Sequence, residues 1–391
     1  MKYFSNANVY INGKIEKTTL CFSDRVIGFS CEKTKENAEN IKLPERSVVL
    51  PGFIDEHIHG AAGYDVMDGN GKGLADMAEF VASEGTVAFL ATTVTASREK
   101  TLKAIDSVVG YVGLKKERGS EILGMHLEGP FLSEEYAGAM NKKYLSAPDK
   151  RLAGEYIDSA KGLVKIFTYA PENDENDEFL KYITGRGIVA SAGHSAAAYA
   201  RVREAELCGL TNVTHTFNAQ SPFKHREIGC AGAALLSDDL NCEIISDTIH
   251  VSVPALKLLV KNKPKNRLIL VTDSMRAKGC GEGISEIGGQ KVIVKNGQAR
   301  LENGTLAGSI LKMNEAVRNM VIKAGVPFCD AVDYASKNPA RVLRVENDLG
   351  SIAIGKRACF TVLDENFEVL FTFRDGNVIY KKHAKSRACS R

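Results

Sequence analysis

The sequence predicts an α/β fold, a (β/α)8 barrel with a small β-sandwich domain that both ends of the chain form together. Three observations lead to this prediction. Eight short apolar runs occur along the chain, most of them separated by helix-like segments. Polar side chains follow these runs, at the point where a barrel places its functional residues. The chain has 391 residues, whereas a barrel alone needs about 250, so a further domain is expected.

Both ends of the chain have the character of a small β domain. Residues 1–50 contain short alternating runs, and Asn12-Gly13 between apolar residues is typical of a tight hairpin. Residues 345–391 contain similar runs and end in a basic, polar tail at 381–391. Neither segment is long enough to bury much core alone. We therefore expect 1–50 and 345–391 to pair into one β-sandwich beside a barrel of residues 51–344.

The eight apolar runs between these ends are the expected barrel strands. They cover residues 47–55, 86–91, 122–128, 163–169, 188–193, 212–214, 242–246 and 267–272. In a TIM-type barrel the carboxyl ends of all strands open on one mouth. Side chains far apart in the sequence, from His57 to Asp273, should therefore share a single site.

Helical periodicity is found where the barrel requires helices. Apolar residues fall on one helical face, or fill the gap after a strand, at 74–82, 197–208, 253–260 and 309–324. Residues 279–308 differ, because short alternating runs flank Asn296-Gly297. This pattern predicts a β-hairpin at 280–305, inserted after the eighth strand.

Five side chains at the expected mouth are of the types that bind divalent metal ions. His57 and His59 point to the same side of their strand, because side chains alternate along a strand. Glu128, His194 and His215 follow three other strands. Each histidine alone could be a packed, hydrogen-bonded core residue, but their coincidence at strand ends favours a metal site. Imidazole and carboxylate ligands suit zinc and related divalent ions.

Asp273 ends the eighth run and is the candidate for proton transfer. A carboxylate that faces a metal-bound water can accept its proton and pass it to a leaving group. The alternative is an acceptor that orients a histidine ligand. We favour the general base, because the five other groups already fill plausible ligand positions.

Composition excludes several classes of protein. The net charge of +3, with both signs interspersed, indicates neither a nucleic-acid groove nor an acidic partner. No apolar run reaches the ~18 residues of a membrane span, and the first residues lack the apolar core of a signal peptide. The nine cysteines include no C-x-x-C pair and are expected to be reduced thiols. A cytoplasmic location is therefore expected.

Seven motifs, in order, span nearly the whole chain. They lie at residues 51–60, 126–131, 193–195, 214–219, 225–227, 271–275 and 306–309. Together they resemble the N-acetylglucosamine-6-phosphate deacetylases, a family of the amidohydrolase superfamily. The motifs at 51–60 and 271–275 are shared across that superfamily. Those around Glu128 and Asn218-Ala219 are more particular to the deacetylases.

The resemblance implies a metal-dependent hydrolase of amino sugar catabolism. It would convert N-acetylglucosamine 6-phosphate to glucosamine 6-phosphate and acetate. Glu128, His194 and His215 would hold the principal metal, and His57 and His59 could hold a second. One or two divalent ions per subunit, zinc or iron or another, are thus implied. Asp273 would be the general base and then the acid.

The resemblance also implies which residues contact the sugar phosphate. They are Ala139, Asn218, Ala219, Arg226, His250, Leu306, Ala307 and Gly308. In relatives the residue matching Arg226 reaches the site of the neighbouring subunit, which implies a homodimer. Arginine suits a phosphate because its planar fork binds two oxygens at once.

Three positions depart from the family pattern. Met140 stands where many relatives carry a hydrogen-bonding side chain near the substrate, and a thioether cannot donate. Gln220 replaces a usual methionine and Thr248 a usual glycine. These changes touch the sugar pocket, so the alternative of a galactosamine-type N-acetyl hexosamine 6-phosphate stays open.

Two further alternatives are weighed against the deacetylase. A different amidohydrolase, such as a dihydroorotase-like cyclic amidase, would use a carboxylated lysine at the end of strand four, where Lys165 lies too early. A deaminase would place a glutamate near His194, which Ser195 and three alanines follow instead. A barrel kept only as a binding protein is disfavoured, because Asp273 and the ligand set are present.

Overall fold

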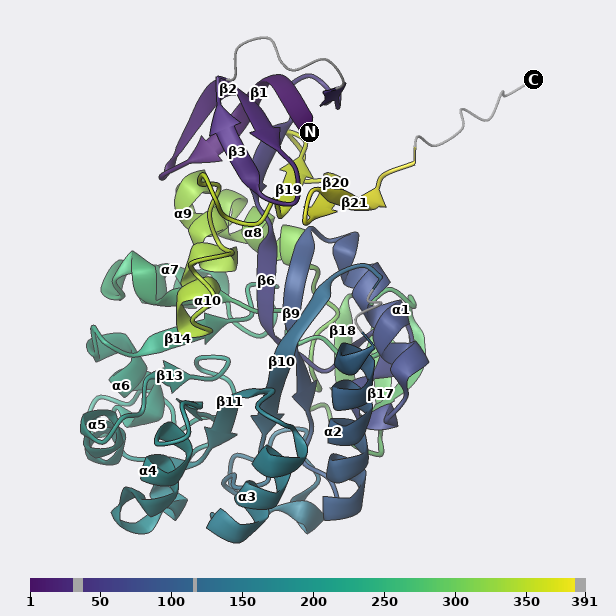
Figure 1. The fold of residues 1–391 in the computed structure, drawn as a ribbon. Coiled ribbons are helices and arrows are strands. Elements are labelled where there is room, and N and C mark those ends of the chain that lie inside the picture. Colours follow the sequence, from purple (N-terminus) through teal and green to yellow (C-terminus); the bar gives the residue numbers. More distant parts are fainter. Residues whose placement is uncertain (31–37, 115–117, 384–391) are drawn as a thin grey trace.

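The computed structural model describes residues 1–30, 38–114 and 118–383, and an eight-stranded parallel barrel lies at its centre (Figure 1). Neighbouring strands follow the order of the chain: β6 (Phe53–Ile58), β9 (Thr86–Thr93), β10 (Glu121–Glu128), β11 (Val164–Tyr169), β12 (Val189–Ala192), β13 (Asn212–Val213), β14 (Asn241–Ile244) and β15 (Leu268–Leu270). The segment after β15 returns to β6, because the Asp273 amide donates to the His57 carbonyl at 2.8 Å. The predicted (β/α)8 barrel is confirmed.

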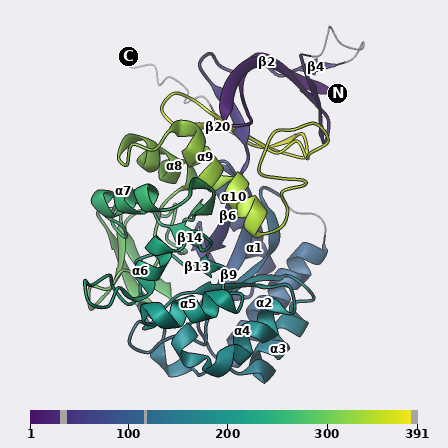
Figure 2. The same ribbon diagram turned by 90° about the vertical axis from the view of Figure 1, so that its left-hand side faces the viewer.

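Helices surround the barrel (Figure 2). They are α1 (Gly71–Ala82), α2 (Arg98–Gly113), α3 (Lys150–Ser159), α4 (Glu178–Thr184), α5 (Tyr199–Leu207), α6 (Gly229–Leu236), α7 (Val253–Asn262), α8 (Met313–Ile322), α9 (Phe328–Ala335) and α10 (Lys337–Val342). Helix α1 illustrates how the sequence produces these helices. The Asn70 side chain caps its first turn by accepting from the Lys72 amide, and Leu74, Met77 and Val81 are buried on one face.

Short elements complete the connections between strands and helices. They are β7 (Gly60–Ala61), β8 (Tyr64–Asp65) and the 3-10 helices η1 (Val66–Asp68), η2 (Lys142–Tyr144), η3 (Pro171–Asn173), η4 (Glu175–Asp177) and η5 (Lys265–Arg267). The helix expected at 309–324 begins only at Met313. Ser309 instead forms a parallel bridge with Ser274, which adds backbone pairing beside the end of β15.

Both ends of the chain contribute to a second, eight-stranded sheet. Its strands are β1 (Lys2–Ile11), β2 (Lys14–Phe22), β3 (Val26–Phe29), β4 (Glu39–Asn40), β5 (Val48–Pro51), β19 (Phe360–Leu363), β20 (Val369–Arg374) and β21 (Asn377–Lys381). Phe4 and Phe22 pack against Phe360 and Phe373 in a core of their own. The two ends therefore form one small β domain, as the sequence predicts, and it is built as one continuous sheet around one core.

The run at 47–55 is divided between the two sheets, contrary to its interpretation as one strand. β5 pairs with β1 and β19, whereas β6 begins at Phe53 in the barrel. Gly52 lies between them, and a Cβ there would come within 2.3 Å of Val87. Only glycine fits this close crossing, so the chain changes sheets at this residue.

The insertion after β15 contains the predicted β-hairpin, which a third strand extends into a three-stranded antiparallel sheet. Its strands are β16 (Gly283–Ile287), β17 (Gln290–Lys295) and β18 (Gln298–Leu301). The predicted turn at Asn296-Gly297 joins β17 to β18, and both residues have positive φ. β16 was missed because most of its residues are exposed and only Ile287 is buried, so it lacks a clear apolar alternation.

Of two smaller expectations, one is wrong and the other falls mostly outside the described residues. Cys21 forms a disulfide bond, whereas all cysteines were expected to be reduced; Cys208, Cys230, Cys242 and Cys280 are among the free thiols. Most of the tail predicted at 381–391 lies outside the described residues. Within the described part of the chain, no helix combines the length and the apolar character that a membrane crossing requires.

Candidate metal centre

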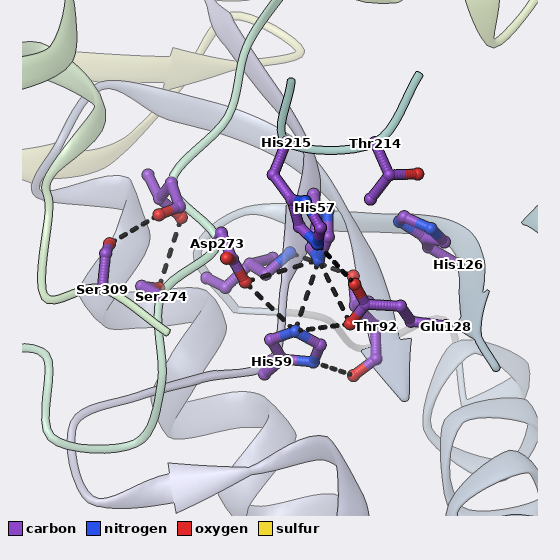
Figure 3. A network of polar contacts seen from close by, with 12 residues as sticks. His57, His59, Thr92, His126, Glu128, Thr214, His215, Asp273, Ser274 and Ser309 are labelled. Atoms are coloured by element: carbon purple, nitrogen blue, oxygen red, sulfur yellow. Dashed lines mark hydrogen bonds and ion pairs between the residues drawn. The ribbon is translucent and has the colours of Figure 1, made fainter. Parts of the chain in front are cut away.

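Four histidine rings and two carboxylates meet at the carboxyl ends of the barrel strands. Figure 3 shows His57, His59, His215, Glu128 and Asp273 of this cluster. Glu128, the last residue of β10, places Oε1 3.1 Å from His194 Nε2 and 3.0 Å from His215 Nε2. Its other oxygen lies 3.1 Å from His59 Nε2 and 3.6 Å from His57 Nε2. The structure thus brings together all five side chains that the sequence proposed as metal ligands. Glu128 lies between the two histidine pairs.

In three of these rings the second nitrogen, Nδ1, already donates a hydrogen bond to a neighbouring oxygen. His57 Nδ1 lies 2.9 Å from Glu243 Oε2, His59 Nδ1 lies 3.3 Å from the Thr92 carbonyl, and His194 Nδ1 lies 2.9 Å from the Tyr136 carbonyl. A carbonyl or carboxylate oxygen only accepts, so each Nδ1 carries the proton. In the neutral rings, Nε2 then presents a lone pair toward the centre of the cluster.

The lone pairs of neighbouring histidine Nε2 atoms therefore face one another at the centre of the cluster. His57 Nε2 lies 3.3 Å from His59 Nε2, and His194 Nε2 lies 3.2 Å from His215 Nε2. Such contacts repel unless a proton or a metal cation lies between the atoms. Two sets of ligand atoms, Glu128 with His57 and His59 and Glu128 with His194 and His215, each lie within 4.8 Å of one another. The donor set fits one or two divalent ions.

The charges of the cluster also favour a cation. Burial lowers the pKa of His59, but hydrogen bonds to Asp273 and Glu128 outweigh burial and raise that pKa to about 9. Burial raises the pKa of Asp273, but the charge of His57 and the hydrogen bond from His59 lower it to about 2. The carboxylates are thus held ionised, as metal ligation requires, and the site stabilises positive charge, which a bound cation would supply in place of the imidazolium proton.

Asp273 lies beside this cluster on the segment that closes the barrel. Its Oδ1 lies 3.2 Å from His59 Nε2 and 3.4 Å from His57 Nε2. Its backbone is fixed on both sides, because its amide donates to the His57 carbonyl and its carbonyl accepts from the Ser309 amide at 2.7 Å. The carboxylate lines the open pocket, so it can meet a substrate as well as the cluster.

Backbone strain is concentrated at this mouth. Positive φ angles occur at His194 (48°), His215 (30°), Ala219 (47°), Thr248 (69°) and Asp273 (46°). None of these residues is glycine, and each follows a barrel strand. Strained backbone that the surrounding fold maintains is typical of functional sites, because it aims side chains where ordinary geometry would not.

A pocket of about 640 Å³ opens over the cluster. Most of the proposed substrate-contacting residues line it, namely Ala139, Asn218, Ala219, His250, Leu306 and Gly308. Ala307 is fully buried beneath this wall. Arg226 is exposed and does not line the pocket of its own chain. A role for Arg226 in this pocket would therefore have to come from another subunit.

Sequence reasoning missed several residues of the site. Glu243 is fully buried and holds both the His57 ring and the His215 amide, the latter at 3.0 Å. It lies within β14, away from the strand end where functional residues were sought. Lys142 and Arg300 are the cationic side chains, other than histidine, that line the pocket. Lys142 begins the 3-10 helix η2 and Arg300 lies in β18 of the inserted sheet, and no sequence motif distinguished them.

His126 belongs to a strand-end motif and its ring packs edge-on against the His57 ring, with centroids 4.5 Å apart, but its own nitrogens bond elsewhere. Its ring bonds to the Thr168 hydroxyl at 2.7 Å and to the Glu56 carbonyl at 3.2 Å. Burial, followed by the charge of His57, lowers its pKa to about 3, so the ring is neutral. It is a satisfied core histidine, the alternative considered for each histidine of the sequence.

The three unusual positions have distinct surroundings. Met140 is buried among apolar side chains of the inserted sheet, which explains how an apolar residue is accommodated there. Gln220 donates to the Thr214 carbonyl at 2.7 Å, so it braces the loop after β13. Thr248 has a positive φ of 69°, a conformation in which glycine would be unstrained.

Comparisons with known proteins agree with this geometry. Residues 48–379 match the model of the amidohydrolase family. The chain is 40% identical over 354 residues to N-acetylglucosamine-6-phosphate deacetylase of Bacillus subtilis, covering 90% of this chain and 89% of that one. It is 34% identical to N-acetylgalactosamine-6-phosphate deacetylase of Escherichia coli O157:H7, over 84% of this chain and 87% of that one.

Solved structures are similar over almost the entire chain. The structure of N-acetylglucosamine-6-phosphate deacetylase from Pasteurella multocida aligns with a TM-score of 0.91 at 31% identity, over 96% of this chain and 99% of that one. A variant of the Mycobacterium smegmatis deacetylase in complex with N-acetyl-D-glucosamine-6-phosphate aligns with a TM-score of 0.89 at 29% identity, over 97% of this chain and 100% of that one. The terminal sheet and the barrel are thus shared with these proteins.

Proposed function

The chain belongs to the amidohydrolase family, and on that premise we propose that it removes the N-acetyl group from N-acetylglucosamine 6-phosphate. The products are glucosamine 6-phosphate and acetate, and the role is in amino sugar metabolism. The observation that carries the proposal is the junction of Glu128 with four histidines, beside an ionised Asp273 that lines the pocket. The names of the curated relatives support the substrate.

Glu128, His194 and His215 are the proposed ligands of the principal metal. His57 and His59, which face the other oxygen of Glu128, would hold a second ion. The imidazole-rich set suits zinc, and iron or another divalent ion is compatible with the same donors. A divalent ion bound there would supply a Lewis acid for the acetyl carbonyl and a water of lowered pKa.

Asp273 is the proposed proton carrier. Its carboxylate is ionised, so it can accept a proton from the attacking water. An amine leaves poorly unless it is protonated, so Asp273 then returns the proton to the sugar nitrogen. The backbone bonds on both sides of Asp273 hold the carboxylate in place for both transfers.

Other pocket residues have free groups that suit a phosphorylated sugar. The Asn218 amide nitrogen donates to the carbonyls of His215 and Thr216 at 3.2 and 3.4 Å, which leaves its oxygen to accept from a hydroxyl. His250 Nδ1 bonds to Asp247 at 2.6 Å, which leaves Nε2 for the ligand. Ala139, Ala219, Leu306, Ala307 and Gly308 are proposed to shape the wall around the sugar.

The phosphate group is expected to matter strongly for catalytic efficiency. Loss of a charge-assisted contact typically costs about 1.5–3 kcal/mol, or roughly tenfold to a hundredfold. N-acetylglucosamine without phosphate should therefore show a kcat/KM lower by at least that factor, measured as acetate release. Equal efficiency on the sugar and its 6-phosphate would contradict the proposed phosphate contacts.

A homodimer in which Arg226 serves the neighbouring site is part of the proposal. Arg226 is exposed and lies outside the pocket of its own chain. Mixing Arg226→Ala subunits with Asp273→Asn subunits should then restore part of the activity that each variant lacks alone. Mixing Lys224→Ala with Asp273→Asn is the matched control, because Lys224 is an exposed cation two residues away. Absence of recovery in a mixture shown to exchange subunits would place Arg226 outside the reaction.

A screen of phosphorylated N-acetyl amino sugars on protein of defined metal content tests the proposed function. The strongest acetate release is expected from N-acetylglucosamine 6-phosphate. Preference for the galactosamine epimer would favour the alternative represented by the Escherichia coli relative. Activity confined to cyclic amides would overturn the deacetylase assignment.

A cytoplasmic location is proposed with this substrate, because sugar phosphates do not diffuse across membranes.

A further inference from the structure

The loop after β10, residues 131–146, holds the metal-ligand candidate His194 from two sides. The Ser133 amide donates to the His194 carbonyl at 2.8 Å. The His194 ring donates through Nδ1 to the Tyr136 carbonyl at 2.9 Å. The loop therefore sets both the backbone position and the ring orientation of His194, including which nitrogen faces Glu128.

Gly138 brings the same loop into contact with the His194 ring. Its φ is +58°, and a Cβ at this position would lie 3.3 Å from His194 Cε1 and 3.6 Å from the Ala219 side chain. The loop backbone thus fills the space beside the ring. A displacement of the loop by a fraction of an ångström would change the contact that orients the ring.

The inserted sheet in turn holds the loop. Its inner face, with Val292, Val294 and Leu301, packs against Met140 and neighbouring apolar residues. At the start of β17, the Gln290 side chain donates through Nε2 to the Ala139 carbonyl at 2.5 Å. Apolar packing is non-directional, so this hydrogen bond is the contact that fixes the register of the loop against the sheet.

We propose that Gln290 is a positioning residue, which acts through Ala139 and the loop to keep His194 oriented for metal binding. The contacts run from Gln290 to the Ala139 carbonyl, and from the same loop to the His194 ring. This inference rests on the proposed function, since it concerns the same metal centre. It assigns to the insertion a role in holding the metal ligands as well as in covering the pocket.

The test uses three substitutions of Gln290 and one neighbour. Gln290→Glu has nearly the same shape but its carboxylate cannot donate to the Ala139 carbonyl. Gln290→Met keeps the length and removes the polar group, and serves if the glutamate variant fails to fold. Gln290→Lys restores a donor. Lys291→Ala is the matched control, because Lys291 is exposed and pairs with exposed Glu302.

Two readouts separate positioning from a merely structural role. The first is affinity for Zn²⁺, measured by competition with a chromophoric chelator. Gln290→Glu and Gln290→Met are expected to bind Zn²⁺ about tenfold more weakly, at the lower end of the effect of groups that orient ligands. Gln290→Lys and Lys291→Ala are expected to stay close to the parent chain. This loss of Zn²⁺ affinity should occur while the melting temperatures of the two variants stay equal to that of the parent chain.

The second readout is amide hydrogen exchange of residues 133–141 in metal-free protein. Exchange should rise in the donor-less variants and return toward the parent rate in Gln290→Lys. Folded Gln290→Glu or Gln290→Met protein with parental Zn²⁺ affinity and parental exchange would overturn the inference. If the parent chain binds neither Zn²⁺ nor another divalent ion, the proposed function fails, and the exchange measurement still decides whether Gln290 holds the loop.

Discussion

Replacing Asp273 with asparagine is expected to lower kcat by ~10²–10⁴-fold, while the protein keeps its metal and its affinity for substrate. Asparagine preserves the shape of the side chain, and the backbone bonds of this residue to His57 and Ser309 do not depend on it. The amide cannot accept a proton from water or return one to the sugar nitrogen. The loss should therefore fall on kcat more than on KM, because the transfer occurs in the transition state.

Asp247→Asn is the matched control for this prediction. Asp247 is the neighbouring carboxylate that orients His250, at 2.6 Å from its Nδ1. Its substitution should weaken the proposed phosphate contact and so raise KM more than it lowers kcat. Steady-state kinetics and metal analysis on both variants separate the two roles. A near-native kcat in Asp273→Asn with intact metal would show that another group transfers the proton, and His250 would be the next candidate.

The convergence of the site could be predicted from the sequence because the chemistry follows the strands. His57, Glu128, His194, His215 and Asp273 lie at or directly after apolar runs. In a parallel barrel, strand direction alone brings such residues to one mouth. This rule requires no knowledge of loop geometry or packing, so the proximity of these residues was predictable.

The residues that support this cluster could not be predicted in the same way. Glu243 orients His57 from within β14, and a carboxylate inside a strand has no local sign of its partner. Gln290 and Arg300 come from an insertion whose position over the pocket depends on tertiary packing. Similarly, the change of sheet at Gly52 arises from close packing against Val87, which is distant in the sequence. Contacts between separate segments decide all of these features.

Removal of His194 or His215 by alanine substitution is expected to abolish tight metal binding and activity together. Each ring supplies one of three close ligands, and Glu128 Oε1 lies within 3.1 Å of both Nε2 atoms. Without the cation, several kcal/mol of charge stabilisation disappear, which corresponds to a rate loss of at least about 10²–10³-fold. Metal content by mass spectrometry and acetate release on the same samples test the prediction.

His59→Ala separates the two halves of the cluster. Of the two Glu128 oxygens, the one that faces His59 Nε2, at 3.1 Å, is not the one that faces His194 and His215, and His59 Nε2 also lies 3.2 Å from Asp273. If two ions bind, this variant should lose one and keep the ion held by Glu128, His194 and His215. His383→Ala is the matched control, because that exposed histidine lies near the end of the described chain, away from the pocket. Full activity of exhaustively chelated, metal-free parent protein would refute a metal-dependent reaction altogether, since the remaining side chains would then have to activate water without a cation.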